Sequence, residues 1–206
     1  MRYFFLDEIF SSITHGLGFL AAVAGLFLFL FLQLHTSDIW RIVGFSIFIG
    51  TLLCMYLFST LFHSLIFTKA KRVFVVLDHS SIFLLIGGTY SYFLLTTMRG
   101  LTGWILLPLI WTLCIGGILF KIFFTERLKL ITVALYLLLG WCILFFIKPF
   151  LHVVSLQTFL FLLLGGLLYS VGTIFYASKK IPFAHTIWHL FVVLATVCHF
   201  WAIYLL

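Results

Sequence analysis

Apolar residues run through the chain in long unbroken stretches, and short polar segments separate them. Each stretch is about twenty residues long, the length at which an α-helix crosses the hydrocarbon core of a bilayer. The stretches do not alternate between apolar and polar over about ten residues, as the strands of a membrane barrel would. The pattern therefore predicts seven membrane-spanning helices, at roughly 14–34, 41–67, 73–96, 102–124, 130–148, 154–177 and 183–206.

The composition supports the same fold class. Of the 206 residues, 65% are hydrophobic and 8% are charged, whereas a soluble domain carries about 25% charged residues. Only helices and closed barrels satisfy their backbone hydrogen bonds in lipid. We therefore predict an all-α polytopic membrane protein, a seven-transmembrane-helix bundle that forms one integral membrane domain over residues 1–206.

Lysine and arginine are distributed unevenly between the two ends of the predicted helices. Nine of the twelve lie near the amino terminus or near the second, fourth and sixth connections. They are Arg2, Lys69, Lys71, Arg72, Lys121, Arg127, Lys129, Lys179 and Lys180. Because basic residues favour the cytoplasmic side, we predict a cytoplasmic amino terminus, an outer carboxyl terminus and a location in the cell membrane. The net charge of +7 is then an orientation signal, and no nucleic-acid partner is expected because there is no soluble basic face.

Three histidines lie at the ends of apolar stretches, where an ionisable side chain is costly and indicates a functional site. His63 lies near the end of the second stretch, and His185 and His189 begin the seventh. The i, i+4 spacing of the pair places both on one helical face, about 6 Å apart along the axis. The predicted orientation brings all three to one depth on the cytoplasmic side. Three imidazoles and one open position form the ligand set of catalytic zinc, although iron, copper and nickel also accept imidazole.

Two more polar residues are expected at the same depth. Ser59 precedes His63 by one helical turn, and Asp78 begins the third stretch. The segment from His185 to His189 lacks the glutamate that soluble zinc proteases carry between their two histidines, so a general base must come from another helix. Asp78 is the candidate base for the water that zinc activates, and Ser59 is the candidate for stabilising an oxyanion. The alternative is that these groups pair with one another and only hold the helices together.

Other ionisable residues leave their roles open. His79 follows Asp78 but points about 100° away around the helix, so we expect it outside the set of metal ligands. Glu8 and His15 either orient a ligand or have a structural role near the amino terminus. His199 lies roughly 15 Å beyond His189 along the helix and is expected to be a buried hydrogen-bonding residue.

The segments that carry these residues resemble the hemolysin III family, the bacterial branch of the progestin and adipoQ receptor family. The resemblance lies in residues 59–63, 77–80 and 185–190 and in the opening segment 7–16. It implies a seven-helix bundle with a cytoplasmic amino terminus and a zinc ion held by His63, His185 and His189. It also implies that Asp78 and Ser59 match the acidic and hydroxyl positions beside the metal. The chain departs from the family in having Ser11 where asparagine is frequent and Tyr92 where proline is frequent.

Related membrane ceramidases share this pattern, so the resemblance implies a hydrolase of lipid amide or ester bonds. A second interpretation is a non-enzymatic sensor or regulator of membrane lipid, in which a structural zinc ion ties the second and seventh helices together. A third takes the family name literally, as a pore-forming cytolysin, but a secreted toxin should be soluble before it inserts. In the first two cases the expected partner is a membrane lipid, and the sequence does not specify an oligomeric state.

Overall fold

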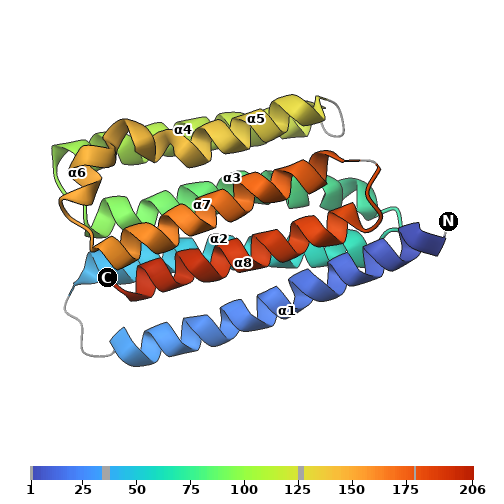
Figure 1. Ribbon diagram of the computed structural model, residues 1–206, viewed down its shortest axis with the longest axis horizontal. Coiled ribbons are helices and arrows are strands. Elements are labelled where there is room, and N and C mark those ends of the chain that lie inside the picture. The colour runs from blue at the N-terminus through green and yellow to red at the C-terminus, as the bar shows by residue number, and fades with distance from the viewer. Residues whose placement is uncertain (1, 34–37, 125–127, 179) are drawn as a thin grey trace.

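The computed structural model describes residues 2–33, 38–124, 128–178 and 180–206. Within these ranges the chain forms long α-helices that run side by side along one axis, without strands (Figure 1). The elements are α1 (Arg2–Gln33), α2 (Ile39–Ser64), α3 (Lys71–Thr96), α4 (Leu101–Phe124), α5 (Lys129–Gly140), the 3₁₀ helix η1 (Trp141–Phe146), α6 (Ile147–Leu151), α7 (Leu156–Ala177) and α8 (Ala184–Tyr204).

Within the described residues, seven segments are long and apolar enough to cross a membrane. Six of them are single helices, namely α1, α2, α3, α4, α7 and α8. The fifth span in chain order combines α5, η1 and α6. Large apolar side chains such as Phe31, Leu101 and Phe123 are exposed on the outer faces of the helices, as expected where lipid replaces water. The predicted all-α fold of a multi-pass membrane protein is confirmed. Two of the basic residues used to predict its orientation, Arg127 and Lys179, lie outside the described residues.

The first helix differs most from its predicted span, because it begins at Arg2 rather than near residue 14. Its first turns carry the polar side chains that precede the apolar stretch in the sequence. These side chains bond to other helices: the Ser12 and Ser64 hydroxyls lie 2.7 Å apart, and the Thr186 backbone N–H donates to Asp7 over 3.0 Å. Tertiary hydrogen bonds therefore extend α1 beyond its apolar part.

The fifth span is interrupted by the 3₁₀ turns of Trp141–Phe146. Pro149 lies in α6 just beyond them, and a proline cannot donate a backbone hydrogen bond and clashes with the carbonyl four residues earlier. The Tyr90 hydroxyl of α3 compensates for part of the disruption. It accepts a bond from the Ile143 N–H over 2.9 Å and donates toward the carbonyl of Gly140 over 3.1 Å. The interruption between α5 and α6 is thus stabilised by hydrogen bonds to Tyr90.

Packing places three helix ends together. The helix α1 lies against both α2 and α8, while α2 also packs on α3, and α7 packs on α8. The end of α2 and the beginning of α8 lie at the end of the bundle that holds the amino terminus, and the carboxyl terminus lies at the opposite end (Figure 1). This arrangement brings His63 toward the pair on α8.

Tyr92, which stands where the family frequently has proline, lies inside an unbroken α3. Its side chain is completely buried, and its hydroxyl donates to the Ile203 carbonyl over 3.2 Å. Tyr92 therefore joins α3 to the end of α8, far along the bundle from His63.

Candidate metal centre

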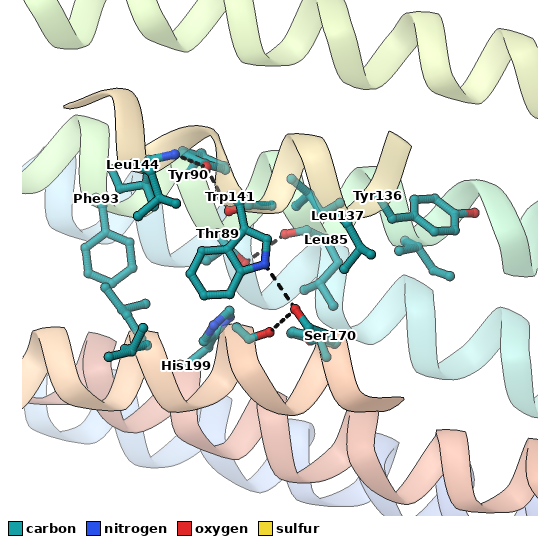
Figure 2. A pocket seen from close by; sticks show the side chains of 18 of the residues that line it. Leu85, Thr89, Tyr90, Phe93, Tyr136, Leu137, Trp141, Leu144, Ser170 and His199 are labelled. Carbon is teal, nitrogen blue, oxygen red and sulfur yellow. Dashed lines mark hydrogen bonds between the residues drawn. The ribbon is translucent and has the colours of Figure 1, made fainter. Parts of the chain in front are cut away.

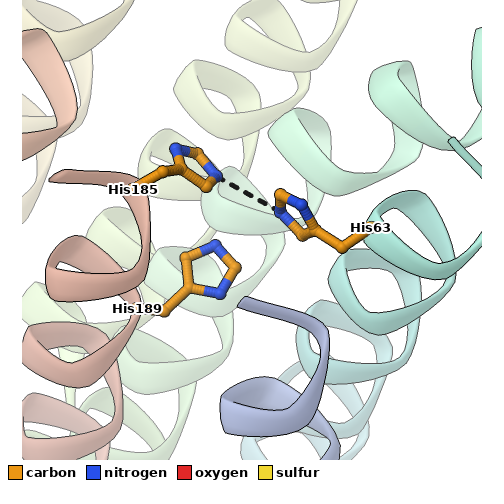
Figure 3. Close-up of side chains that lie close together, drawn as sticks. All are labelled: His63, His185 and His189. Carbon is orange, nitrogen blue, oxygen red and sulfur yellow. Dashed lines mark hydrogen bonds between the residues drawn. The ribbon is translucent and has the colours of Figure 1, made fainter. Parts of the chain in front are cut away.

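The three predicted histidines meet in one cluster between α2 and α8 (Figure 3). Their ring centres form a nearly equilateral triangle with sides of 4.7, 4.8 and 4.9 Å. One ring nitrogen from each residue lies within 4.8 Å of the other two. His63 and His189 are buried, and His185 is half-buried. The cluster could therefore hold a metal ion.

The spacing of one pair of these nitrogens is close to that in a tetrahedral zinc site. The Nε2 atoms of His63 and His185 lie 3.2 Å apart. Two nitrogens bound to one tetrahedral zinc ion at its usual bond length would be about 3.3–3.4 Å apart. The pair therefore needs little movement to share an ion.

Two of the three rings contact α1 through their Nδ1 atoms. Glu8 Oε2 lies 2.6 Å from His63 Nδ1, and the Ser11 carbonyl oxygen lies 3.1 Å from His189 Nδ1. Each oxygen accepts a hydrogen bond from an Nδ1–H, which leaves the Nε2 lone pair of that ring free for a metal. Metal-binding histidines usually have such a partner, which also makes the imidazole more basic. The structure shows a contact between Glu8 and His63, and the role of Glu8 in orienting a metal ligand stays a prediction.

Asp7 holds the beginning of α8 in place. Residue Phe183, just before this helix, has a left-handed backbone with φ of 56° and provides no side-chain cap. Asp7 Oδ1 instead accepts hydrogen bonds from the Thr186 N–H over 3.0 Å and from its hydroxyl over 2.5 Å. A carboxylate is favourable here because the first amides of a helix lack partners and carry partial positive charge. Asp7 thus sets the position of the turn that carries His185.

A small cavity of about 30 Å³ adjoins the cluster and is lined by His185 and His189. A single water needs roughly 10–15 Å³, so this space suits a water or a small polar group. Ser59 and Asp78 line the same cavity, as expected from their predicted depth. The Ser59 hydroxyl is buried and has no hydrogen-bond partner among the described residues, which is consistent with a polar group in the cavity.

His15 also borders this cavity, and its ring stacks on His189 with a centre separation of 3.6 Å. Both ring nitrogens of His15 are buried without a partner within the described part of the chain. His15 therefore supports a metal-cluster ring and offers polar atoms to the cavity, without belonging to the cluster itself.

A second cavity of about 230 Å³ lies further along the bundle, between α3, the α5–η1 segment, α7 and α8 (Figure 2). Its walls are almost entirely apolar and include Leu85, Phe93 and Leu137. Trp141 reaches across it and donates from Nε1 to the Ser170 hydroxyl over 3.0 Å (Figure 2). The two cavities share four wall residues, which are Ile82, Leu85, Tyr169 and Trp188.

Two further histidines whose roles the sequence left open, His79 and His199, lie outside the cluster. His79 donates from Nδ1 to the Val75 carbonyl over 2.6 Å and forms part of the small cavity's wall. His199 lines the large cavity and packs edge-on against Tyr169, with ring centres 5.5 Å apart. Gly165 permits this position, because a Cβ atom there would lie 2.4 Å from the His199 ring.

Sequence reasoning did not identify Asp7, the Ser11 carbonyl or Tyr169 as parts of this region. A signal existed for α1, in which the polar residues Asp7, Ser11 and His15 recur every four residues. Such spacing places side chains on one helical face. No comparable pattern marks Tyr169, because a tyrosine in an apolar helix is common.

Comparisons with known proteins agree with this architecture. A family model described as "Haemolysin-III related" matches residues 3–200. The chain is 46% identical over 186 residues to the "Hemolysin-3 homolog" of Bacillus subtilis (strain 168), covering 90% of this chain and 87% of the relative. It is 45% identical over 192 residues to "Hemolysin-3" of Bacillus cereus, covering 93% and 88%. It is 28% identical over 197 residues to the human "Monocyte to macrophage differentiation factor", covering 93% and 80%.

Removing the clustered histidines tests whether they hold a metal ion. We expect the His63→Ala variant, and the double variant of His185 and His189 to alanine, to lose zinc after purification from zinc-supplemented cells, because fewer than three imidazoles remain. Metal analysis by mass spectrometry measures this loss. His152→Ala is the control, since His152 is exposed and outside the cluster. Full zinc retention by the alanine variants would contradict the assignment of the cluster.

Glu8→Gln should weaken metal binding without abolishing it. The amide is similar in shape but lacks the negative charge that faces His63 Nδ1, and loss of such a partner typically lowers metal affinity roughly 10- to 100-fold. Competition with a zinc chelator measures the affinity. Asp38→Asn removes a carboxylate at the opposite end of α2 and should leave the affinity unchanged. Equal affinities in the wild type and the Glu8 variant would show that Glu8 does not act on the metal site.

Proposed function

The chain belongs to the haemolysin-III related family, and we propose that it is a zinc-dependent hydrolase of membrane lipids, acting near the cytoplasmic leaflet. The bond cleaved is an amide or an ester. One observation carries this proposal: three imidazoles converge beside a small buried cavity that Asp78 and Ser59 also line.

The ligand set favours zinc in a catalytic rather than a structural role. Structural zinc sites have four protein ligands, whereas catalytic sites have three and keep one position open. The cluster contains three histidines among the described residues. When bound, zinc would supply Lewis acidity and activate water near neutral pH.

Asp78 and Ser59 would handle the proton and the developing charge. Asp78 accepts the proton of the attacking water as general base and passes it to the nitrogen or oxygen that leaves the substrate carbonyl. The Ser59 hydroxyl, which has no other partner among the described residues, donates a hydrogen bond to the carbonyl oxygen as it gains negative charge. His63 and His189 stay oriented by Glu8 and Ser11 throughout.

The adjoining large cavity supports a lipid substrate. Its apolar walls would bury a hydrocarbon chain favourably, since burial gains about 25 cal/mol per Å² of apolar surface. Four wall residues are shared by the large cavity, which would hold the lipid's hydrocarbon chain, and the small cavity beside the histidines. A lipid whose chain fills the large cavity would place its carbonyl group toward the small one.

The name of the Bacillus cereus relative, "Hemolysin-3", favours a second candidate function, which is lysis of membranes. Addition of purified protein to dye-loaded liposomes tests it. Dye release by the wild type that persists after removal of His63, His185 and His189 would favour lysis over hydrolysis.

Asp78→Asn should keep zinc and lose turnover. The amide cannot accept the proton, and loss of a general base typically slows a reaction roughly 10²- to 10⁴-fold. Release of fatty acid from a fluorescent N-acyl sphingosine in nanodiscs measures turnover, and metal analysis of the same sample measures zinc.

Ser59→Ala should retain zinc and slow turnover roughly 10²- to 10³-fold. Asp38→Asn should match the wild type. A zinc-loaded wild type without activity on amide and ester lipids would contradict the proposed function.

The proposed orientation places the metal cluster at the cytoplasmic side. Fusions at the carboxyl terminus test it, because α8 ends at the opposite side of the bundle from the histidines. In a bacterial host we expect a fused alkaline phosphatase to be active, since it folds only outside the cytoplasm, and a fused green fluorescent protein to be dark. The reverse result would place the cluster at the outer side.

A further inference from the structure

Polar atoms without hydrogen-bond partners gather around the small cavity. They are both ring nitrogens of His15, the Ser59 Oγ and the Tyr169 hydroxyl, and each is buried. The three residues come from α1, α2 and α7, yet all line this one cavity. A buried polar group without a partner destabilises a fold. The arrangement therefore indicates that the cavity receives polar atoms from a ligand or water.

Tyr169 differs from the other two because it also lines the large apolar cavity. Two further tyrosines line that cavity, and both hydroxyls already have backbone partners. Tyr90 donates to the Gly140 carbonyl over 3.1 Å, and Tyr136 donates to the His79 carbonyl over 2.6 Å. Among the described tyrosines of this cavity, only Tyr169 has a buried hydroxyl without a partner. Tyr169 thus lines both the apolar cavity and the small cavity beside the histidines.

We propose that Tyr169 is a specificity-determining residue that recognises the polar end of the lipid substrate. Its phenolic O–H donates a hydrogen bond to the carbonyl oxygen of a chain that lies in the large cavity. This inference rests on the proposed function, because it assumes that the large cavity holds the substrate's chain. A site built around such a bond selects chains with a polar end over plain hydrocarbons, since without the polar end its hydroxyl stays unpaired.

The size of the small cavity limits what Tyr169 can recognise. A space of about 30 Å³ exceeds the roughly 10–15 Å³ that a single water needs. It suits a small polar group such as a carbonyl, amide or hydroxyl. Tyr169 is therefore expected to recognise a small polar group of the lipid.

A purely structural role for Tyr169 predicts different behaviour. Its hydroxyl makes no hydrogen bond to another described residue, so Tyr169→Phe should leave the melting temperature unchanged or raise it. Tyr92→Phe is the matched variant, because it removes a buried hydroxyl that does donate a bond, to Ile203. That variant should lower the melting temperature and leave lipid binding unchanged, since Tyr92 lines neither cavity.

Binding of two bromine-labelled probes tests the recognition directly. One is a long-chain methyl ketone, whose carbonyl cannot be hydrolysed, and the other is an alkane of the same length. Bromine quenches tryptophan fluorescence, and Trp141 and Trp188 line the large cavity. In phosphatidylcholine nanodiscs, with zinc content measured on each sample, we expect Tyr169→Phe to weaken ketone binding roughly 5- to 10-fold, as loss of one hydrogen bond does. Alkane binding should stay unchanged.

Two results would overturn the role of Tyr169 alone. They are equal weakening of both probes, which indicates packing, and unchanged ketone binding. If neither probe quenches the wild type, the large cavity holds no chain, and the proposal falls together with the lipid part of the proposed function. The zinc and turnover measurements remain a separate test of the metal chemistry, so the two failures can be distinguished.

Discussion

The structure depends on the convergence of three imidazoles at one point of an apolar bundle. Each ring must turn Nε2 inward, and a buried Nδ1–H needs an acceptor, because lipid and apolar side chains offer none. Glu8 and the Ser11 carbonyl provide acceptors for His63 and His189. Both belong to α1, which contributes no ligand to the cluster. The polar beginning of α1 is therefore part of the candidate metal centre as much as the helices that carry the histidines.

This constraint explains why α1 continues far beyond its apolar stretch. The same face that carries Glu8 and Ser11 also carries Asp7, which caps α8 at Thr186, and His15, which stacks on His189. These contacts connect the beginning of α1 to the beginning of α8 and to the end of α2. Movement of α1 would change ring orientation, helix position and cavity shape together, so the proposed chemistry depends on its docking.

The two cavities divide the proposed work. The small one gathers the polar groups, including Ser59 and Asp78, and is large enough for a water or a carbonyl. The large one is apolar and is closed in part by the Trp141 contact to Ser170. Keeping the polar region small limits the water beside the cluster, which strengthens electrostatic interactions there. Tyr169 stands where the two environments meet.

Much of this architecture could be predicted from the sequence, for identifiable reasons. The length of the apolar stretches predicted seven spans. The i, i+4 spacing and the shared depth predicted that His63, His185 and His189 lie together. Hydropathy could not reveal that α1 begins at Arg2, because its polar turns are stabilised only by tertiary bonds to residues such as Ser64 and Thr186. The break at Trp141–Phe146 and the free hydroxyl of Tyr169 also depend on packing. The catalytic roles of Asp78 and Ser59 stay predictions.

X-ray absorption at the zinc edge of the purified protein tests the central claim most directly, because it reports the number and kind of atoms bound to the metal. We predict a four-coordinate zinc ion with three imidazole nitrogens and one oxygen at about 2.0–2.1 Å. Absence of zinc, or a shell filled by four protein nitrogens or sulfurs, would contradict an open metal centre at His63, His185 and His189.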